Sequence, residues 1–238
     1  MQDANISSAC AGTAIGTVTT MTDTRDNNTY KVAKLADQKC WMIQNLNLDV
    51  AAASSAGKLG NAYTNSSSSS FTYTSVKDDE SNYLTTSSSP YNHYVLNTST
   101  NSGYYQYGVA TLGSGADISS GTASYDICPK GWRLPTGNTS GEFQALYSAY
   151  SSTYANYING SATNNNTAGA IPGFGLTGRY DANSSLKGLR YQSSHGYWWS
   201  STLYNATNAY YQNANTSSVN PAYYANKFSG YSVRCVAK

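Results

Sequence analysis

Cysteine is the side chain in this sequence with the most direct covalent chemistry. The four cysteines lie far apart: Cys10, Cys40, Cys128 and Cys235. No two of them form a C-x-x-C pair, and only two histidines, His93 and His195, could complete a metal site, so the spacing argues against zinc. Four cysteines allow three disulfide pairings, of which we favour Cys10–Cys40 with Cys128–Cys235. Four buried free thiols in a cytosolic protein are the alternative.

Carboxylate and imidazole groups, which carry acid–base chemistry, show no catalytic pattern. The 12 Asp and Glu residues scatter through expected turns without a recurrent pair. His195 is expected to face solvent in a loop. The sequence DTRD at 23–26 holds two acids, but no further acidic ligands follow at the spacing of a calcium loop, so a turn is favoured. We therefore predict no catalytic residue, no metal site and no cofactor.

The overall composition limits the classes of partner. The 238 residues include 14 basic and 12 acidic ones, which gives a formal net charge of +2 and 11% charged residues, against roughly 25% in an average globular protein. A chain so weakly charged offers no field for a polyanion, so we predict no nucleic-acid partner. No run of 18 apolar residues is present, so no membrane-spanning segment is expected. Its first residues do not form a signal peptide, so export would require a leader outside this sequence.

The segment 191–231 has the composition of a binding surface. Its 41 residues include 8 Tyr, 6 Asn and 2 Trp, with Lys227 as the one full charge. Tyr and Trp supply large contact areas with few rotors to freeze, and Ser and Asn supply adaptable hydrogen bonds, as in antibody-like binding sites. The predicted ligand-binding residues are Tyr191, Tyr197, Trp199, Tyr204, Asn205, Asn208, Tyr210, Tyr211, Asn213, Asn215, Tyr223, Tyr224 and Asn226. The alternative is that the aromatic residues belong to the core, to which we assign Trp198.

Short strands are expected to position this segment. Residues 17–48 alternate as a β-hairpin followed by a buried strand, and further short strands are expected within 174–236. Strand periodicity places alternate residues from 209 to 215 on one face. A loop over 216–228 would then bring Tyr223, Tyr224 and Asn226 beside that face.

One helix is predicted, over 139–150. Thr139 and Glu142 fit a capping box, and an apolar stripe follows at helical spacing. Ala- and Ser-rich stretches within 51–90 predict an exposed Ser/Tyr-rich insertion, and aromatic residues over 91–112 are expected to rejoin the core. One helix among many short strands indicates an α+β fold.

Five motifs occur together in this chain: DTRD at 23–26, WMIQNL at 41–46, CPKGWRLPT at 128–136, GYWWSST at 196–202 and SVRCV at 232–236. In this order they resemble the Fibrobacter succinogenes major paralogous domain, a family similar to the C-type lectin fold and to its formylglycine-generating and retroelement-diversified branches. The resemblance spans nearly the whole chain and implies a single domain over 1–238. It implies a small twisted antiparallel sheet, one or two helices, long loops, and N- and C-terminal strands side by side. It also supports the Cys128–Cys235 bridge.

The resemblance does not extend to calcium-dependent sugar binding. That branch of the lectin fold uses Glu-Pro-Asn or Gln-Pro-Asp and Trp-Asn-Asp triplets, none of which occurs here. No Asp or Glu follows Asp181, although calcium needs several convergent oxygens.

These observations favour a bacterial binding module, secreted or displayed at the cell surface, that holds a protein or glycan ligand of another cell surface through its Tyr/Asn/Trp-rich C-terminal face. The Asn, Tyr and Ser content is compatible with a variable protein of a diversity-generating retroelement. A structural surface or pilus-associated subunit without a discrete ligand is the main alternative, and an unrecognised enzyme is a weaker one.

Overall fold

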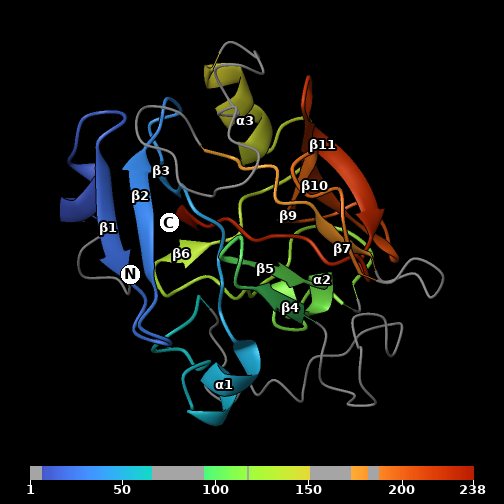
Figure 1. Ribbon diagram of the computed structural model, residues 1–238, viewed down its shortest axis with the longest axis horizontal. Helices are drawn as coiled ribbons and strands as arrows, with labels where there is room; N and C mark the ends of the chain where they lie inside the picture. The colour runs from blue at the N-terminus through green and yellow to red at the C-terminus, as the bar shows by residue number, and fades with distance from the viewer. Residues whose placement is uncertain (1–6, 66–93, 117, 151–172, 182–187) are drawn as a thin grey trace.

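The computed structural model describes residues 7–65, 94–116, 118–150, 173–181 and 188–238. Small antiparallel sheets and a few short helices form a mixed α+β structure with two disulfides (Figure 1). The predicted α+β class is therefore confirmed. Most of the predicted insertion, from 66 to 90, lies outside the described residues. In the part of the chain that the structure describes, no helix is long and apolar enough to cross a membrane.

The largest sheet brings the two ends of the described chain together. Its five strands lie in the order β1 (Val18–Thr22), β2 (Thr29–Lys34), β3 (Cys40–Met42), β12 (Val236–Ala237) and β6 (Trp132–Arg133). Val236 of the last strand pairs with Trp41 on one side and Arg133 on the other. Strands from the N- and C-terminal regions therefore lie side by side, as Figure 1 shows.

The predicted hairpin and turn at the start of the chain are confirmed. β1 and β2 pair antiparallel from Val18–Ala33 to Thr22–Thr29, and the turn between them contains the DTRD sequence. The Asp23 carboxylate accepts hydrogen bonds from the Arg25 guanidinium, and both side chains are fully buried. Arg25 also donates to the carbonyl of Ile127 at 2.6 Å, so the turn is attached to the segment before Cys128.

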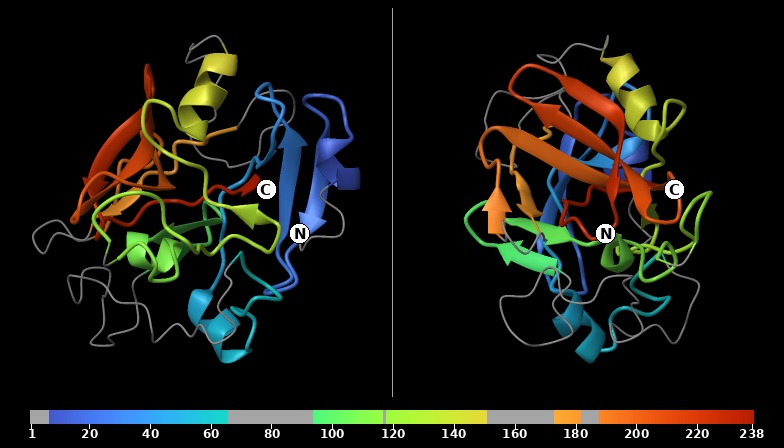
Figure 2. Two further views of the ribbon diagram at one scale, coloured as in Figure 1. Left: turned by 180° about the vertical axis from the view of Figure 1, so that it is seen from behind. Right: turned by 90° about the vertical axis from the view of Figure 1, so that its right-hand side faces the viewer.

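A second sheet on the opposite flank carries most of the segment 191–231. Its strands lie in the order β11 (Val219–Asn226), β10 (Asn208–Asn215) and β9 (His195–Leu203). The right panel of Figure 2 shows these strands across the face turned toward the viewer. Two smaller hairpins pair β4 (Tyr94–Asn97) with β5 (Ser102–Tyr105) and β7 (Arg179–Asp181) with β8 (Gly188–Arg190).

The helices are short. They are the π-helical turn η1 (Ser7–Ala11) and the α-helices α1 (Val50–Ser55), α2 (Tyr107–Ala110) and α3 (Glu142–Ala149). Helix α1 corrects the prediction of an exposed insertion over its own residues, because Val50 and Ala53 are buried in the core. Residues 94–112 do rejoin the core, as predicted.

Helix α3 confirms the predicted helix but begins three residues later. Gly141 is its N-cap residue and makes no side-chain cap, so Thr139 forms no capping box. Thr136 makes the reciprocal contacts instead: its hydroxyl accepts from the Glu142 amide, and its amide donates to the Glu142 carboxylate at 2.9 Å. The predicted capping box had the correct glutamate but the wrong threonine.

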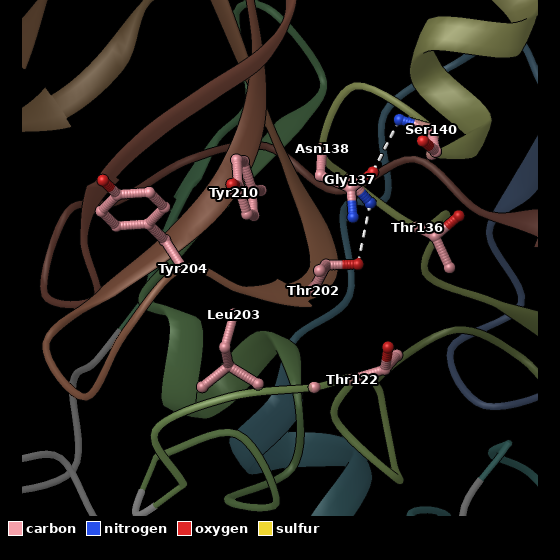
Figure 3. Close-up of a pocket in the computed structure, with 11 residues that line it drawn as sticks. Thr122, Thr136, Gly137, Asn138, Ser140, Thr202, Leu203, Tyr204 and Tyr210 are labelled. Atoms are coloured by element: carbon pink, nitrogen blue, oxygen red, sulfur yellow. Dashed lines mark hydrogen bonds between the residues drawn. The ribbon is translucent and has the colours of Figure 1, made fainter.

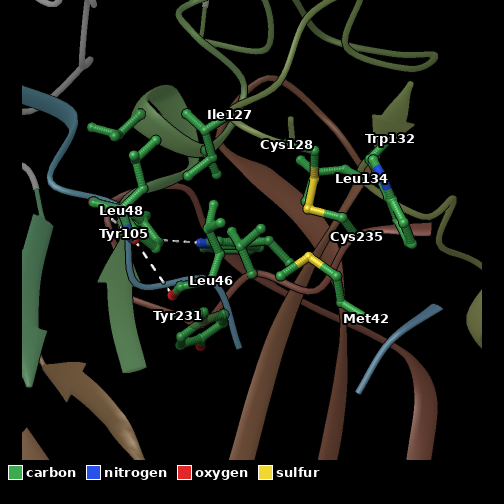
Figure 4. Close-up of a cluster of buried hydrophobic side chains, with 14 of the residues drawn as sticks. Met42, Leu46, Leu48, Tyr105, Ile127, Cys128, Trp132, Leu134, Tyr231 and Cys235 are labelled. Carbon is green, nitrogen blue, oxygen red and sulfur yellow. Dashed lines mark hydrogen bonds between the residues drawn. A yellow bond between two sulfur atoms is a disulfide. The ribbon is translucent and has the colours of Figure 1, made fainter. Parts of the chain in front are cut away.

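The two largest of three apolar clusters join the sheets. The larger surrounds the Cys128–Cys235 disulfide and includes Trp132 and Trp199 (Figure 4). The smaller joins Trp198 to the apolar side of α3. Trp198 and Trp199 enter different clusters because successive residues of a strand face opposite sides of its sheet. The structure has both bridges of the favoured pairing, Cys10–Cys40 and Cys128–Cys235.

Candidate functional site

The predicted ligand-binding residues do not share one face of the sheet. Tyr197, Trp199 and Tyr211 are buried, with exposed fractions of 6%, 0% and 4%. The Trp199 indole donates to the carbonyl of Tyr105 at 2.8 Å, and the Tyr211 and Tyr231 rings lie 4.7 Å apart. This corrects the prediction for these three residues: they are core side chains and leave no surface for a ligand.

A β-bulge lies in the pairing of β11 with β10. The pairing register of β10 with β11 shifts between Tyr211 and Asn213. Ala209, Tyr211 and Gln212 are all buried, whereas Asn213 is partly exposed. The extra residue of this bulge lies in β11, whereas Tyr211, Asn213 and Asn215 pair with Trp199, Tyr197 and His195 of β9 in an unbroken register, so the predicted alternation in β10 holds. The predicted loop over 216–228 is wrong, since most of it is strand β11.

Two of the predicted asparagines hold the turns of this sheet. The Asn205 side-chain oxygen accepts from the amides of Thr207 and Asn208 between β9 and β10. Asn215 does the same for the amides of Ser217 and Ser218 between β10 and β11. Asn side chains favour such turns because they mimic a backbone carbonyl. Their oxygens are therefore engaged inside the protein.

The side chains of the other predicted asparagines make fewer hydrogen bonds to the backbone. Asn208 donates to Asn205, and Asn213 donates to the carbonyl of Gly196 at 3.3 Å. Asn226 is exposed on β11, opposite Asn208 in the register. Of the predicted asparagines, Asn226 thus offers the most accessible amide.

Four of the predicted tyrosines do come together at the surface, and we refer to Tyr204, Tyr210, Tyr223 and Tyr224 as the tyrosine cluster. The rings of Tyr204 and Tyr224 stack with centroids 3.8 Å apart and planes within 5°. Tyr210 meets Tyr204 edge-on at 5.4 Å, and Tyr223 lies 6.1 Å from Tyr224. Tyr204, Tyr223 and Tyr224 are 44%, 52% and 46% exposed. The four rings form one contiguous aromatic surface, because each ring contacts another of the cluster.

The sheet explains why these rings meet. Tyr210 of β10 pairs directly with Tyr224 of β11, so their side chains are cross-strand neighbours. Tyr204 follows the end of β9, and its amide donates to the carbonyl of Asn208 at the start of β10. A hydrogen bond with the Tyr204 hydroxyl raises the pKa of the Tyr224 phenol above its ordinary value of 10.0.

A pocket of about 520 Å³ adjoins the cluster, and its size falls in the ~300–1,000 Å³ range of small-molecule sites. Figure 3 shows its walls, which come from the end of β9, Tyr210 of β10, the segment before α3 and the loop at 121–122. The lining residues carry no formal charge: Gly121, Thr122, Thr136, Gly137, Asn138, Ser140, Gly141, Thr202, Leu203, Tyr204 and Tyr210. Only Tyr204 and Tyr210 of these were among the predicted site residues.

Glycine lets the segment before α3 approach the sheet. A β-carbon on Gly137 would lie 2.3 Å from the Ser200 hydroxyl and 2.5 Å from the Tyr210 β-carbon. The Gly137 amide donates to the Thr202 hydroxyl at 2.9 Å (Figure 3). The signal that could have found this wall is the sequence Gly137-Asn138, which marks a tight turn between a recognised motif and the predicted helix.

Tyr191, also a predicted site residue, lies in a different environment. The Arg179 guanidinium carbon lies 5.2 Å from its ring centroid and 5.3 Å from that of Tyr197, and Arg179 is paired with Asp181 at 3.1 Å. His195 lies 5.1 Å from the Tyr191 ring; burial and then the charge of Arg179 lower its pKa, which keeps the imidazole neutral at pH 7. Burial raises the pKa of Tyr197 to about 12. Charge is internally paired here, so this cluster is a weaker candidate.

Comparison with known proteins adds no relative: no protein-family model, no curated protein and no solved structure matches this chain. The site must therefore be interpreted from its own geometry.

Proposed function

We propose that this chain is a binding module that holds an uncharged ligand on the tyrosine cluster. The single observation that carries the proposal is the clustering of exposed aromatic rings. Among the described residues, six large apolar side chains are exposed, and Tyr204, Tyr223 and Tyr224 are three of them. Contiguous aromatic surface on a folded domain is typical of a contact site, whereas isolated exposed apolar residues need no explanation.

The chemistry of the cluster favours aromatic burial and neutral hydrogen bonds over ion pairing. Its four members carry phenol hydroxyls, which can donate and accept hydrogen bonds at the rim of a contact. The residues that line the adjoining pocket also carry no formal charge. Pre-stacked rings lose little conformational freedom on binding, so more of the contact energy is retained as affinity.

A C-type-lectin-like fold and a location outside the cytoplasm belong to the same proposal. Two features support the fold: the pairing of β12 with β3 and the bridge from Cys128 to Cys235 beside the last strand. Two disulfides support an oxidising compartment, because such bridges persist in secreted and surface proteins and are rare in reducing ones. The ligand would then be a protein or glycan on another cell surface.

A test compares three forms of the oxidised domain on an array of bacterial surface proteins and neutral glycans. The first is the natural sequence, the second carries Tyr223→Ser and Tyr224→Ser, and the third carries Ile15→Ser. Ile15 is a matched control, since it is as exposed as Tyr224 (46%) and precedes β1 on the opposite flank (Figure 1). We expect partners that the Tyr variant loses and the Ile15 variant keeps.

The result that would contradict the proposal is a set of partners that is the same for all three forms, or no partner at all. Either result would favour a structural surface subunit without a discrete ligand. Circular dichroism of the Tyr variant must show that its fold is intact.

A further inference from the structure

The pocket beside the tyrosine cluster combines two kinds of wall. Tyr204 and Tyr210 form an aromatic side, and Asn138, Ser140 and Thr202 form a side of hydroxyl and amide groups (Figure 3). A ligand that fills this space must have one apolar face and a rim of hydrogen-bonding groups. The lining therefore restricts the chemistry of the ligand more than the tyrosine cluster does.

The polar wall retains hydrogen-bonding capacity beyond its internal contacts. The Asn138 oxygen accepts from the Ser140 amide at 2.7 Å, which leaves the amide nitrogen of this partly exposed side chain to donate. The Thr202 hydroxyl accepts from the Gly137 amide, so its own proton is available. Ser140 is exposed and adds a further hydroxyl.

The aromatic wall is fixed in place before any ligand arrives. Tyr204 stacks on Tyr224 at 3.8 Å on one side and meets Tyr210 edge-on at 5.4 Å on another. Tyr210 is partly buried, and its β-carbon lies against Gly137. The wall thus presents aromatic surface at a fixed position relative to the Asn138 amide.

Charge is absent from the lining, and the carboxylate next to it is already paired. Glu142 follows the last lining residue of the segment before α3, and its oxygens accept from both Arg133 guanidinium nitrogens and from Lys39. An anionic ligand would lose hydration in the pocket without gaining a cation, which is unfavourable.

We propose that this pocket binds one uncharged pyranose ring of a glycan, with the C–H face of the sugar against Tyr210 and its hydroxyls on Asn138, Ser140 and Thr202. A pyranose has the required apolar face and polar rim. The inference rests on the proposed binding function and names the ligand class for the pocket that adjoins the cluster. No metal ion takes part in this mode of recognition.

The test is nuclear magnetic resonance of the ¹⁵N-labelled full chain with methyl glycosides of glucose, galactose, mannose and N-acetylglucosamine as probes. At sugar concentrations up to about 50 mM, complexes with Kd values near ~10 mM become detectable. We expect saturable shifts of the amides of Gly137, Asn138, Ser140 and Thr202 with at least one neutral probe. Methyl glucuronide, which differs from methyl glucoside by a carboxylate, should shift them at least tenfold less.

Two pairs of variants locate the binding. Tyr210→Ala should abolish the shifts, whereas Tyr210→Phe keeps the ring and should retain them within about twofold. Asn138→Gly removes the amide at a residue with φ of 75°, and should weaken binding about three- to tenfold, as expected for one neutral hydrogen bond. Asn27→Gly is its control, because Asn27 also has a positive φ, of 61°, but is an exposed residue of the β1–β2 turn.

Three results would overturn the inference: no saturable shift with any neutral probe, an equal response to the glucuronide, or unchanged binding by Tyr210→Ala. These results can be separated from failure of the proposed function, because Tyr223 and Tyr224 are not among the lining residues. Loss of an array partner by the Tyr223/Tyr224 variant would show that the tyrosine cluster binds that partner. If in the same study no sugar shifts the pocket amides, the pocket does not bind a pyranose and only the proposed function stands.

Discussion

Asn45 and Trp198 lie 153 positions apart in the chain and share a buried hydrogen bond. The Trp198 indole nitrogen donates to the Asn45 side-chain oxygen at 2.9 Å, and the Arg234 guanidinium donates to the same oxygen at 2.8 Å. All three side chains have no exposed surface. Three of the sequence motifs, at 41–46, 196–202 and 232–236, therefore meet at one atom, and their role is structural.

Asn45→Ala should lower the free energy of unfolding by roughly 3–5 kcal/mol, because it leaves a buried guanidinium and an indole N–H without their shared acceptor. Urea denaturation followed by tryptophan fluorescence measures this loss. Asn220→Ala is the control: Asn220 is an exposed residue of β11 whose side chain accepts only a local bond from the Ala222 amide. Its effect should stay within about 1 kcal/mol. Equal losses in the two variants would show that Asn45 is not a structural centre.

The two disulfides should differ in the stability they provide. In the chain-entropy description, a loop of 107 residues closed by Cys128–Cys235 contributes about 4.8 kcal/mol, and one of 30 residues closed by Cys10–Cys40 about 3.6 kcal/mol. Replacing each pair with alanines should therefore lower the urea midpoint more for the long bridge. A larger loss on removal of Cys10–Cys40 would contradict this order.

Glu142 should make the free energy of unfolding decrease as the pH falls into the acidic range. Burial alone would raise the pKa of Glu142, but hydrogen bonds from Arg133, Lys39 and Thr136 outweigh it and lower the pKa to about 2, below the ordinary 4.5. Because the folded-state pKa is depressed, the ionised group stabilises the fold above pH 4.5, and this contribution is lost as the pH falls toward 2.

The natural sequence should exceed Glu142→Gln by roughly 2–3 kcal/mol in free energy of unfolding at pH 7. The difference should shrink steadily below about pH 4.5 in urea titrations. A difference that stays constant down to pH 3 would show that the carboxylate is not held ionised by its partners.

The division of the tyrosines into core and surface can be measured through stability. Tyr211→Ser removes a buried ring and should cost roughly 3–5 kcal/mol, whereas Tyr223→Ser removes one that is 52% exposed and should cost less than about 1 kcal/mol. The two residues are cross-strand partners in β10 and β11, so the backbone context is matched. Similar costs would mean that Tyr223 also belongs to the core.

Ligand affinity should depend weakly on salt. Because the tyrosine cluster and the pocket lining carry no formal charge, dissolved salt has no ion pair with the ligand to screen there. Between about 50 mM and 500 mM NaCl, the Kd of a captured partner should change less than about threefold. A steep loss of affinity with salt would point to an ionic contact elsewhere on the surface.

Much of the fold could be predicted from the sequence, because its signals are local or covalent. The β1–β2 hairpin follows from alternation around a turn, and helix α3 follows from its apolar stripe. Its predicted start was wrong by three residues, because two threonines lie within reach of Glu142 and only tertiary contacts select Thr136. The C-type-lectin-like assignment stays a prediction, since the observed sheets show the α+β class and no more.

The site was less predictable, because composition does not say which face of a strand is buried. Tyr211 and Tyr223 look equivalent in the sequence, yet one is core and the other surface, since β11 is an edge strand and β10 is central. The bulge in β11 does have a sequence signal, Pro221, because proline within a sheet is confined to edge strands and bulges. The turn role of Asn205 and Asn215 could not be predicted from composition, because the same side chain suits a turn and a contact site equally well.

Hydroxyl-radical footprinting of the domain, free and bound to a partner retained in the array test, shows whether the tyrosine cluster is the contact surface. We expect Tyr204, Tyr223 and Tyr224, all accessible in the free protein, to lose most of their reactivity in the complex. Ile15, which is 46% exposed and precedes β1, should keep its reactivity. Protection of other surfaces with unchanged reactivity of the three tyrosines would contradict binding through the tyrosine cluster.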